Sequence, residues 1–416
     1  MSEKNTIDNT TSLPDGWRKV LLGEVCEIDW GNTSLTKVIY TISGFPVYSA
    51  TGQDGFTDFY ENEGKAIILS AIGSYAGKVF FASGKWTAIK NTIVIKAKKN
   101  VEVDIRYIFY DVKRKNYWTL SGSGQPFITL TSALNQIIYL PSIHEQRKIA
   151  EILETVDNAI EKTDKIIEKY KRIKQGLMQD LLTRGIDENG NIRREKTHRF
   201  KDSPLGRIPE EWEIGYIADF AIINPKTKIN PKEFYPFIEM DAIPIMGKKY
   251  AYLNFRQGKE AGSKFKKGDI IIARITPCAE NGKALLIPND IDYGIGSTEF
   301  IVFRAKENVY NCFLFYLIIS DKVRSIAIGL MEGTSGRQRI PKYVFEKVIT
   351  SSIPKSESEQ KRIAEILSQI DHVIEKEEQY KQKLEHIKQG LMADLLTGKV
   401  RVNHLINGED YVQKAR

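Results

Sequence analysis

The segment EQRKIAEIL, Glu145 to Leu153, recurs as EQKRIAEIL, Glu359 to Leu367, and KQGLMQDLLT, Lys174 to Thr183, recurs as KQGLMADLLT, Lys388 to Thr397. One offset of 214 residues relates both pairs, so the two copies align without a gap from the first glutamate to the last threonine. This alignment has 22 identities in 39 positions, which is far beyond chance. The chain therefore contains an internal duplication, and the same structural unit is expected twice.

Each duplicated segment is predicted to form one long helix. Apolar residues recur in both at three- and four-residue steps, which is the spacing of an amphipathic helix and of a coiled coil. Pro141 and Pro354 stand before the helices and Gly185 and Gly398 stand after them, as expected for helix boundaries. The apolar positions assigned to helix pairing or partner docking are Ile149, Leu153, Ile160, Leu177, Met178, Leu181, Ile363, Leu367, Ile374, Leu391, Met392 and Leu395.

These positions have two interpretations. Because two amphipathic helices bury their apolar stripes against each other, the stripes are interpreted as a core between helices. The near-identical KQGLM segments have a second interpretation, in which one chain offers two equivalent docking surfaces to a partner. The demands of a common fold would also preserve these segments, so the sequence leaves both interpretations open.

The helix lengths suggest a geometry. About 39 helical residues at a rise of 1.5 Å give a rod of roughly 58 Å. If the two rods pack antiparallel, the globular unit that precedes each helix lies at the opposite end from the other unit. The chain would then have approximate two-fold symmetry, with the rods setting the distance between the two units.

The fold class predicted is α+β, with two globular mixed β/α domains separated by two long helices packed as an antiparallel coiled coil in a pseudo-two-fold repeat. Strand-like apolar runs and one helix are expected in each globular unit, the helices at Ile105 to Val112 and Cys312 to Ile319. The predicted division is a disordered N-terminus at 1–12, a first globular unit at 13–142, a helix at 143–183, a solvated linker at 184–206, a second globular unit at 207–355, a helix at 356–397 and a C-terminal tail at 398–416.

Composition narrows the class of protein. The formal charge of +8 and the pI near 9.0 favour a polyanionic partner, because lysine and arginine near phosphates release condensed counterions. The polar first residues lack the apolar core of a secretion signal and no window is long enough to span a bilayer, so a cytoplasmic protein without membrane contact is expected. Cys26, Cys278 and Cys312 lie far apart and the five histidines form no HxxxH pair, so neither disulfides nor a metal site is predicted.

Motifs for catalysis are missing from the sequence. It contains no NPPY- or DPPY-like motif of adenine methyltransferases, and the loop from Gly73 to Lys78 is one residue too short for a phosphate-binding loop. The triplet Glu63-Gly64-Lys65 is too common to mark a nuclease. No catalytic residue and no cofactor are therefore predicted for this chain.

The duplicated helices, together with the segment KDSPLGRIPEEW from Lys201 to Trp212, resemble the specificity subunits of type I restriction-modification systems. The resemblance spans about residues 13 to 400. It implies that each globular unit is a target recognition domain that reads one half of a bipartite site in double-stranded DNA, and that two methyltransferase subunits dock on the chain. It also implies that S-adenosylmethionine, ATP and magnesium belong to partner subunits, including two restriction motor subunits where the system has them.

Candidate DNA contacts lie beside strand ends and in a glycine-rich loop that closes each globular unit. Arginine can bind guanine and glutamine can bind adenine through paired hydrogen bonds, whereas phosphate contact or plain solvent exposure is the alternative for each residue. The candidates are Ser74, Tyr75, Lys78, Lys90, Ser123 and Gln125 in the first unit, and Arg274, Lys283, Arg337, Gln338 and Arg339 in the second.

Two other functions compete with DNA recognition. A chain that was itself a methyltransferase or nuclease would bind its cofactor or metal in isolation, and the missing motifs argue against it. A coiled-coil adaptor that joins proteins would explain the helices but leaves the positive charge without a role. Salt-dependent binding to duplex DNA by the assembled complex separates these hypotheses, because phosphate contacts weaken steeply with salt.

Overall fold

The chain forms two compact units in the computed structural model, which describes residues 13–122, 124–334 and 336–406. One unit contains the described residues of Met1–Lys165 and Glu378–Arg416, and the other is Ile166–Glu377. The predicted disordered N-terminus and the last ten residues of the predicted tail lie outside the described residues.

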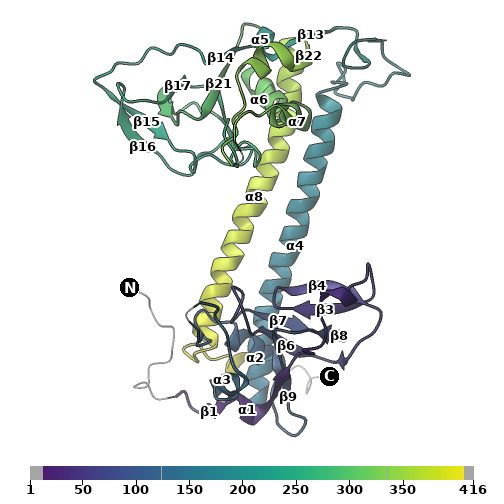
Figure 1. Cartoon of the computed structure of the whole chain (residues 1–416), viewed down its shortest axis with the longest axis vertical. Coiled ribbons are helices and arrows are strands. Elements are labelled where there is room, and N and C mark those ends of the chain that lie inside the picture. Colours follow the sequence, from purple (N-terminus) through teal and green to yellow (C-terminus); the bar gives the residue numbers. More distant parts are fainter. Residues whose placement is uncertain (1–12, 123, 335, 407–416) are drawn as a thin grey trace. The chain divides into compact units, whose positions relative to one another are not determined.

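Each long helix contributes one half to each unit. These helices are α4, Ile143–Leu181, and α8, Glu357–Leu395 (Figure 1). The first unit, called unit 1 below, therefore holds the beginning of α4 and the end of α8, and unit 2 holds the end of α4 and the beginning of α8.

The described residues of unit 1 form three sheets. Strand β1, Arg18–Leu21, pairs antiparallel with β10, Ile137–Leu140, directly ahead of α4. The two larger sheets have four strands each, in the orders β2-β9-β6-β7 and β4-β3-β8-β5. Their strands are β2 Cys26–Trp30, β3 Phe45–Ser49, β4 Gly52–Thr57, β5 Asn62–Glu63, β6 Ala66–Ser70, β7 Val79–Ala82, β8 Lys85–Ala88 and β9 Thr92–Ala97, and the short helices are α1 Leu22–Val25, α2 Ile105–Val112 and α3 Leu130–Leu134.

Unit 2 repeats this arrangement. Strand β13, Trp212–Tyr216, pairs antiparallel with β22, Thr350–Pro354, directly ahead of α8. Its larger sheets have the orders β14-β21-β18-β19 and β16-β15-β20-β17, which match the orders in unit 1 strand for strand. The elements are β14 Ala221–Ile223, β15 Phe234–Ile238, β16 Asn254–Gln257, β17 Ser263–Lys266, β18 Ile270–Ala273, β19 Ala284–Leu286, β20 Tyr293–Gly296, β21 Phe300–Ala305, α5 Ile217–Phe220, α6 Asn311–Ile319 and α7 Asp321–Gly329, with a further hairpin of β11 Phe200–Lys201 and β12 Ile208–Pro209.

A central strand of each unit is covered on both faces, which is why its sequence is largely apolar. In β6 every residue is buried, and Ile67 and Leu69 join one core cluster whereas Ala66 and Ile68 join another. Successive side chains of a strand point to opposite faces, so both faces of this strand need apolar residues. Strand β18 repeats the pattern in unit 2, and the α+β fold class with two repeats is confirmed.

Within each unit the two helix halves run antiparallel. In unit 1 Lys388 forms an ion pair with Asp157, and Lys381 forms another with Asp164 at 2.7 Å. Asp164 lies seven residues after Asp157 on α4, whereas Lys381 lies seven residues before Lys388 on α8, as in an antiparallel pair. In unit 2 Lys174 pairs with Asp371 at 2.5 Å. The offset of 214 residues carries Asp157 onto Asp371 and Lys174 onto Lys388, so the same ion pair occurs once in each unit.

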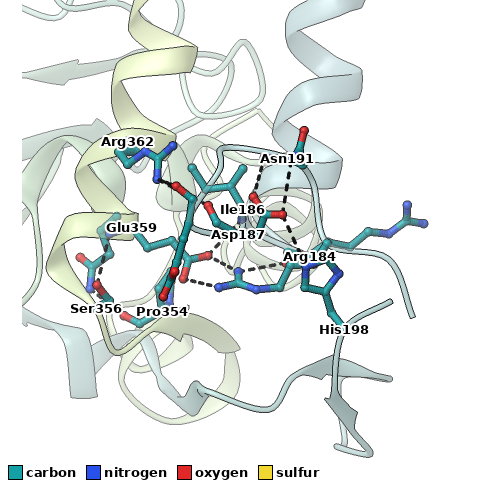
Figure 2. Close-up of polar contacts among 12 residues, drawn as sticks. Arg184, Ile186, Asp187, Asn191, His198, Pro354, Ser356, Glu359 and Arg362 are labelled. Carbon is teal, nitrogen blue, oxygen red and sulfur yellow. Dashed lines mark hydrogen bonds and ion pairs between the residues drawn. The ribbon is translucent and has the colours of Figure 1, made fainter. Parts of the chain in front are cut away.

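The segment 184–206 differs from the predicted solvated linker. Most of it is polar, but Ile186 and Arg193 are buried. Arg193 Nη2 donates to Glu359 Oε2 at 3.0 Å, and the backbone amide of Ile186 donates to Glu359 Oε1 at 3.1 Å. Figure 2 shows Glu359 and Arg362, on the first turns of α8, reaching into this segment, where Arg362 Nη1 donates to the Glu188 carbonyl at 2.9 Å. The segment is therefore packed onto the start of α8.

Candidate nucleic-acid interface

Three loops of unit 1 meet where β6 ends. They are the loop after β6 at 71–78, the turn before β9 at 89–91 and the closing loop at 121–128, of which residue 123 is not described. The amide of Ala71 donates to the Asn91 carbonyl at 2.9 Å, and the amide of Ile128 donates to the Ala71 carbonyl at 2.8 Å. These backbone hydrogen bonds fix the loops against one another, and we call the assembly the three-loop frame.

Unit 2 contains the same frame, built from residues 274–283, 297–299 and 332–340, of which residue 335 is not described. The amide of Arg274 donates to the Glu299 carbonyl at 2.9 Å, and the amide of Ile340 donates to the Arg274 carbonyl at 2.8 Å. These two bonds repeat those of Ala71 in unit 1. The two frames therefore have the same backbone hydrogen bonds and differ in their side chains.

The frame of unit 1 brings the predicted DNA contacts together. Ser74, Tyr75 and Lys78 are exposed on the first loop, and the Lys78 Nζ lies 4.0 Å from the ring centre of Tyr75. Lys90 is exposed on the second loop and Gln125 on the closing loop. Ser123 lies outside the described residues.

In unit 2 the predicted DNA-contacting side chains differ in their exposure and in whether they already bind another group of the protein. Lys283 Nζ donates to the Met240 carbonyl at 2.8 Å, and Arg274 is half-buried with its Nε 3.9 Å from Glu299 Oε2. Gln338 takes part in the frame through its backbone, since its carbonyl accepts from the amide of Thr276 at 3.0 Å. Arg337 is exposed. Arg339 is part-exposed, and its guanidinium binds Glu299.

Glu299 is the functional candidate that the sequence interpretation missed. Its carboxylate accepts from Arg339 Nε at 3.0 Å and from Nη2 at 2.8 Å. Hydrogen bonding from Arg339 holds the pKa of Glu299 below its ordinary value, and the same bonds raise the pKa of Arg339. A glutamate just before a strand carries no local pattern that signals such a role, because its partner lies 40 residues away.

The predicted helix-pairing residues are found mainly in the cores. Ile149, Leu153 and Leu395 are buried in the core of unit 1, whereas Leu181, Ile363 and Leu367 are buried in that of unit 2. Of the remaining positions, Ile374 is buried, Leu177, Met178, Leu391 and Met392 pack partly buried against these cores, and Ile160 is half-buried.

A second set of helix positions faces outward. Ile166 and Ile173 are 40% and 37% exposed on α4, and their counterparts at the offset of 214 residues, Tyr380 and Ile387, are 51% and 52% exposed on α8. We call these two sets the outer stripes. The two copies therefore expose apolar residues at equivalent places.

Other kinds of site receive no support from the part of the chain that the structure describes. No cluster of three or more His, Cys, Asp or Glu side chains could hold a metal ion among those residues. The described helices include none that is both long and apolar enough to cross a bilayer.

Comparison with known proteins assigns the chain to a family. Residues 14–171 and 209–386 match the model of the type I restriction modification DNA specificity domain. The chain belongs to this family. Each match covers one globular unit and most of the helix that follows it, so the two specificity domains coincide with the duplication.

One relative from the specificity family matches nearly the whole chain, and another matches about half of it. The type I restriction enzyme MjaVIII specificity subunit of Methanocaldococcus jannaschii is 30% identical and the alignment covers 94% of this chain and 95% of the relative. The Escherichia coli EcoEI specificity subunit is 28% identical over 46% of this chain and 33% of its own. The crystal structure of the S subunit of a type I restriction-modification system from M. genitalium has the same fold, with a TM-score of 0.60, 14% identity, and coverage of 94% of this chain and 97% of that one.

Proposed function

We propose that each unit of this specificity subunit reads one half of a bipartite target in double-stranded DNA. Membership of the specificity family supports DNA recognition and does not support an adaptor that ignores DNA. The observation that carries the division into two readers is the three-loop frame, whose hydrogen bonds at Ala71 recur at Arg274 under different side chains. Two domains that recognise different DNA sequences need the same loop backbone with different exposed side chains.

The exposed groups of the frames suit contact with duplex DNA. Lys78, Lys90 and Arg337 can neutralise phosphates. Gln125 pairs one donor with one acceptor and Arg339 has paired donors, and both patterns can distinguish base edges in the major groove. Phosphate contacts supply affinity without sequence information, so the base-reading groups decide which half-site each unit selects.

We infer that the chemistry belongs to partner subunits. The relatives carry the name of specificity subunits, and methylation of adenine with S-adenosylmethionine is assigned here to two methyltransferase subunits. ATP-driven translocation and magnesium-dependent cleavage are assigned to restriction subunits in a system that has them. This chain then determines where the partners act.

The outer stripes are proposed as the docking surfaces for the two methyltransferase subunits. Gly176 and Gly390 lie inside α4 and α8, three residues beyond Ile173 and Ile387, and a Cβ atom at either glycine would meet nothing within 4 Å among the described atoms. A glycine in a helix interior costs roughly 0.5–1 kcal/mol relative to alanine. Close approach of a partner backbone explains why both copies keep glycine here, and two equivalent surfaces fit two subunits.

A domain exchange tests the two-reader proposal. Residues 13–142 are replaced by the corresponding unit of another specificity subunit, and the chimera is assembled with its methyltransferase subunit. Methylated adenines in a plasmid library are then located by single-molecule sequencing. We expect one half of the recognised sequence to change while the other half and the spacing stay the same. A change in both halves, or in neither, would contradict the proposal.

A further inference from the structure

We propose that Arg339 reads a guanine in the half-site of unit 2, and that Glu299 holds its guanidinium in the reading orientation. The inference rests on the proposed function, since it names the base-reading group of a unit already proposed to read DNA. It is carried by the hydrogen bonds of this one guanidinium, by its exposure and by its place in the frame.

Glu299 occupies one edge of the Arg339 guanidinium. Arg339 Nε lies 3.0 Å from both carboxylate oxygens of Glu299, and Nη2 lies 2.8 Å from Oε1. Nη1 makes a longer contact of 3.4 Å with the Arg337 carbonyl. A guanidinium has five N–H donors in one plane, so donors of Nη1 and Nη2 at the far end stay available. The side chain is 41% exposed, which leaves that end open to a ligand.

The free end of a guanidinium matches guanine. Two parallel N–H groups of arginine bind O6 and N7 of guanine in the major groove, and this is the commonest specific contact between a protein and a base pair. A carboxylate behind the guanidinium fixes its plane before binding, so less side-chain freedom is lost when DNA arrives. Arg339 has this support, because Glu299 holds it and the pKa of Glu299 is lowered by the same hydrogen bonds.

The backbone of Arg339 is fixed as well. Its amide donates to the Glu332 carbonyl at 2.8 Å, and its carbonyl accepts from the Glu332 amide at 2.9 Å. A bridge to Ile275 ties the residue to the first loop of the frame. Both the position and the orientation of the guanidinium are thus set before a ligand binds.

The other cations of this frame are less suited to reading a base. Lys283 is bound to the Met240 carbonyl, and Arg274 is half-buried beside the same Glu299. Arg337 is exposed, but no hydrogen bond from its side chain is found in the described part of the chain. An unsupported exposed arginine suits a phosphate, which needs charge and no fixed plane.

The counterpart of Arg339 in unit 1 is Phe127. Phe127 makes the equivalent paired backbone hydrogen bonds with Ser121, both at 2.9 Å, and the equivalent bridge to Ile72. Phe127 is 37% exposed. One position of the frame therefore presents a guanidinium in one unit and an apolar ring in the other, as expected where two half-sites differ in sequence.

The test measures base preference in the assembled methyltransferase complex. Each complex methylates a library of DNA duplexes randomised across both half-sites, and the methylated molecules are sequenced. The complexes contain the wild-type chain or one of the variants R339Q, R339K, E299Q, R337Q and F127A. We expect wild type to require guanine at one position of the second half-site. R339Q should reduce the preference for that guanine by about 10- to 100-fold and leave the first half-site unchanged.

The other variants distinguish base recognition by an oriented guanidinium from attraction by a positive charge alone. R339K keeps the charge without the planar fork, so it should lose most of the guanine preference, and E299Q should lose part of it. R337Q should lower methylation of all sequences alike, and F127A should leave the guanine position unaltered. An unchanged guanine preference in R339Q, with the complex assembled and the first half-site intact, overturns the inference. If R339Q fails to assemble, the R339K profile decides in the same way.

Failure of the proposed function has a different signature. A wild-type complex that methylates every sequence equally would show that the chain does not select DNA. A wild-type complex with a normal bipartite preference that no Arg339 variant changes would refute only the role of Arg339.

Discussion

Arg401 binds Glu145 through two parallel contacts, from Nε to Oε1 at 2.7 Å and from Nη2 to Oε2 at 2.9 Å. The side chain of Glu145 is only 1% exposed. In unit 2, Arg193 also binds both carboxylate oxygens of Glu359, the counterpart of Glu145, but through Nη1 and Nη2. In each unit the first turn of one long helix is therefore held by an arginine from the segment that follows the other long helix.

Replacement of Glu145 with alanine should lower the stability of unit 1. The change leaves Arg401 without its carboxylate partner, and breaking a buried ion pair costs about 3 kcal/mol. Urea unfolding followed by circular dichroism measures the effect. Glu161→Ala is the control, because its ion pair with Lys165 is exposed and such pairs contribute about 0.5 kcal/mol or less. Equal unfolding midpoints for the two variants would show that the buried pair contributes nothing special.

The ion pair between Asp157 and Lys388 should show a measurable coupling. Asp157 also accepts a hydrogen bond from Tyr110 Oη at 2.9 Å, and the three groups join α2, α4 and α8 within unit 1. Lys388 is 16% exposed, so solvent screens the pair less than it screens Lys165 with Glu161. A double-mutant cycle with Asp157→Asn and Lys388→Met should give a coupling of about 1 kcal/mol. A coupling no larger than that of the Lys165 pair would refute the expectation.

Asp111 should make the stability of unit 1 depend on pH. Its carboxyl is fully buried on α2, with Arg114 Nη2 at 2.7 Å but no well-aligned hydrogen bond to either oxygen in the described part of the chain. Burial raises the pKa of Asp111 from 3.8 to about 6. The folded state thus binds the proton more tightly than the unfolded chain, so this contribution to stability is complete below about pH 4 and is lost as the pH rises through 6.

The variant Asp111→Asn should flatten this dependence. A shift of about two pKa units corresponds to about 3 kcal/mol between pH 4 and pH 7. Urea midpoints measured across that range for wild type, Asp111→Asn and the exposed-site control Glu161→Gln give the three slopes. We expect the wild type and the control to lose stability equally as the pH rises, whereas the stability of the Asp111 variant should change much less. A variant that follows the wild-type slope would show that other groups cause it.

The long helices and the duplication could be predicted because their signals are local or repeated. Helical spacing of apolar residues needs only a window of sequence, and the observed α4 and α8 follow it. The apolar run in β6 likewise predicted a buried strand. Helix α7, Asp321–Gly329, was not predicted, because it has only nine residues, too short a window to show a clear helical period.

The candidate site could be predicted only in outline. Glycine-rich turns pointed to the closing loops, but the hydrogen bonds of Ala71 to Asn91 and Ile128 join segments that are distant in sequence. Nothing local distinguishes Arg339, which is held by a carboxylate, from Lys283, whose ammonium is bound to a backbone carbonyl. That distinction depends on tertiary contacts and decides which side chains are available to DNA.

The glycines of the outer stripes give the sharpest test of partner docking. Gly176→Ala and Gly390→Ala should each stabilise the isolated chain slightly, by about 0.5–1 kcal/mol, because alanine is the better helix former and the added methyl meets open space. The same methyl would collide with a closely packed partner helix and weaken docking about 10- to 100-fold at that surface.

Native mass spectrometry of the chain with its methyltransferase subunit counts the occupied surfaces. Either single variant should bind one methyltransferase where wild type binds two, and the double variant should bind none at the same concentrations. Gln179→Ala is the matched control, because it is exposed on the same helix and its counterpart in the second copy is already Ala393. It should retain two bound subunits. Glycine variants that also bind two would place the docking surfaces elsewhere, since a methyl group at a tight helix contact has no room to be accommodated.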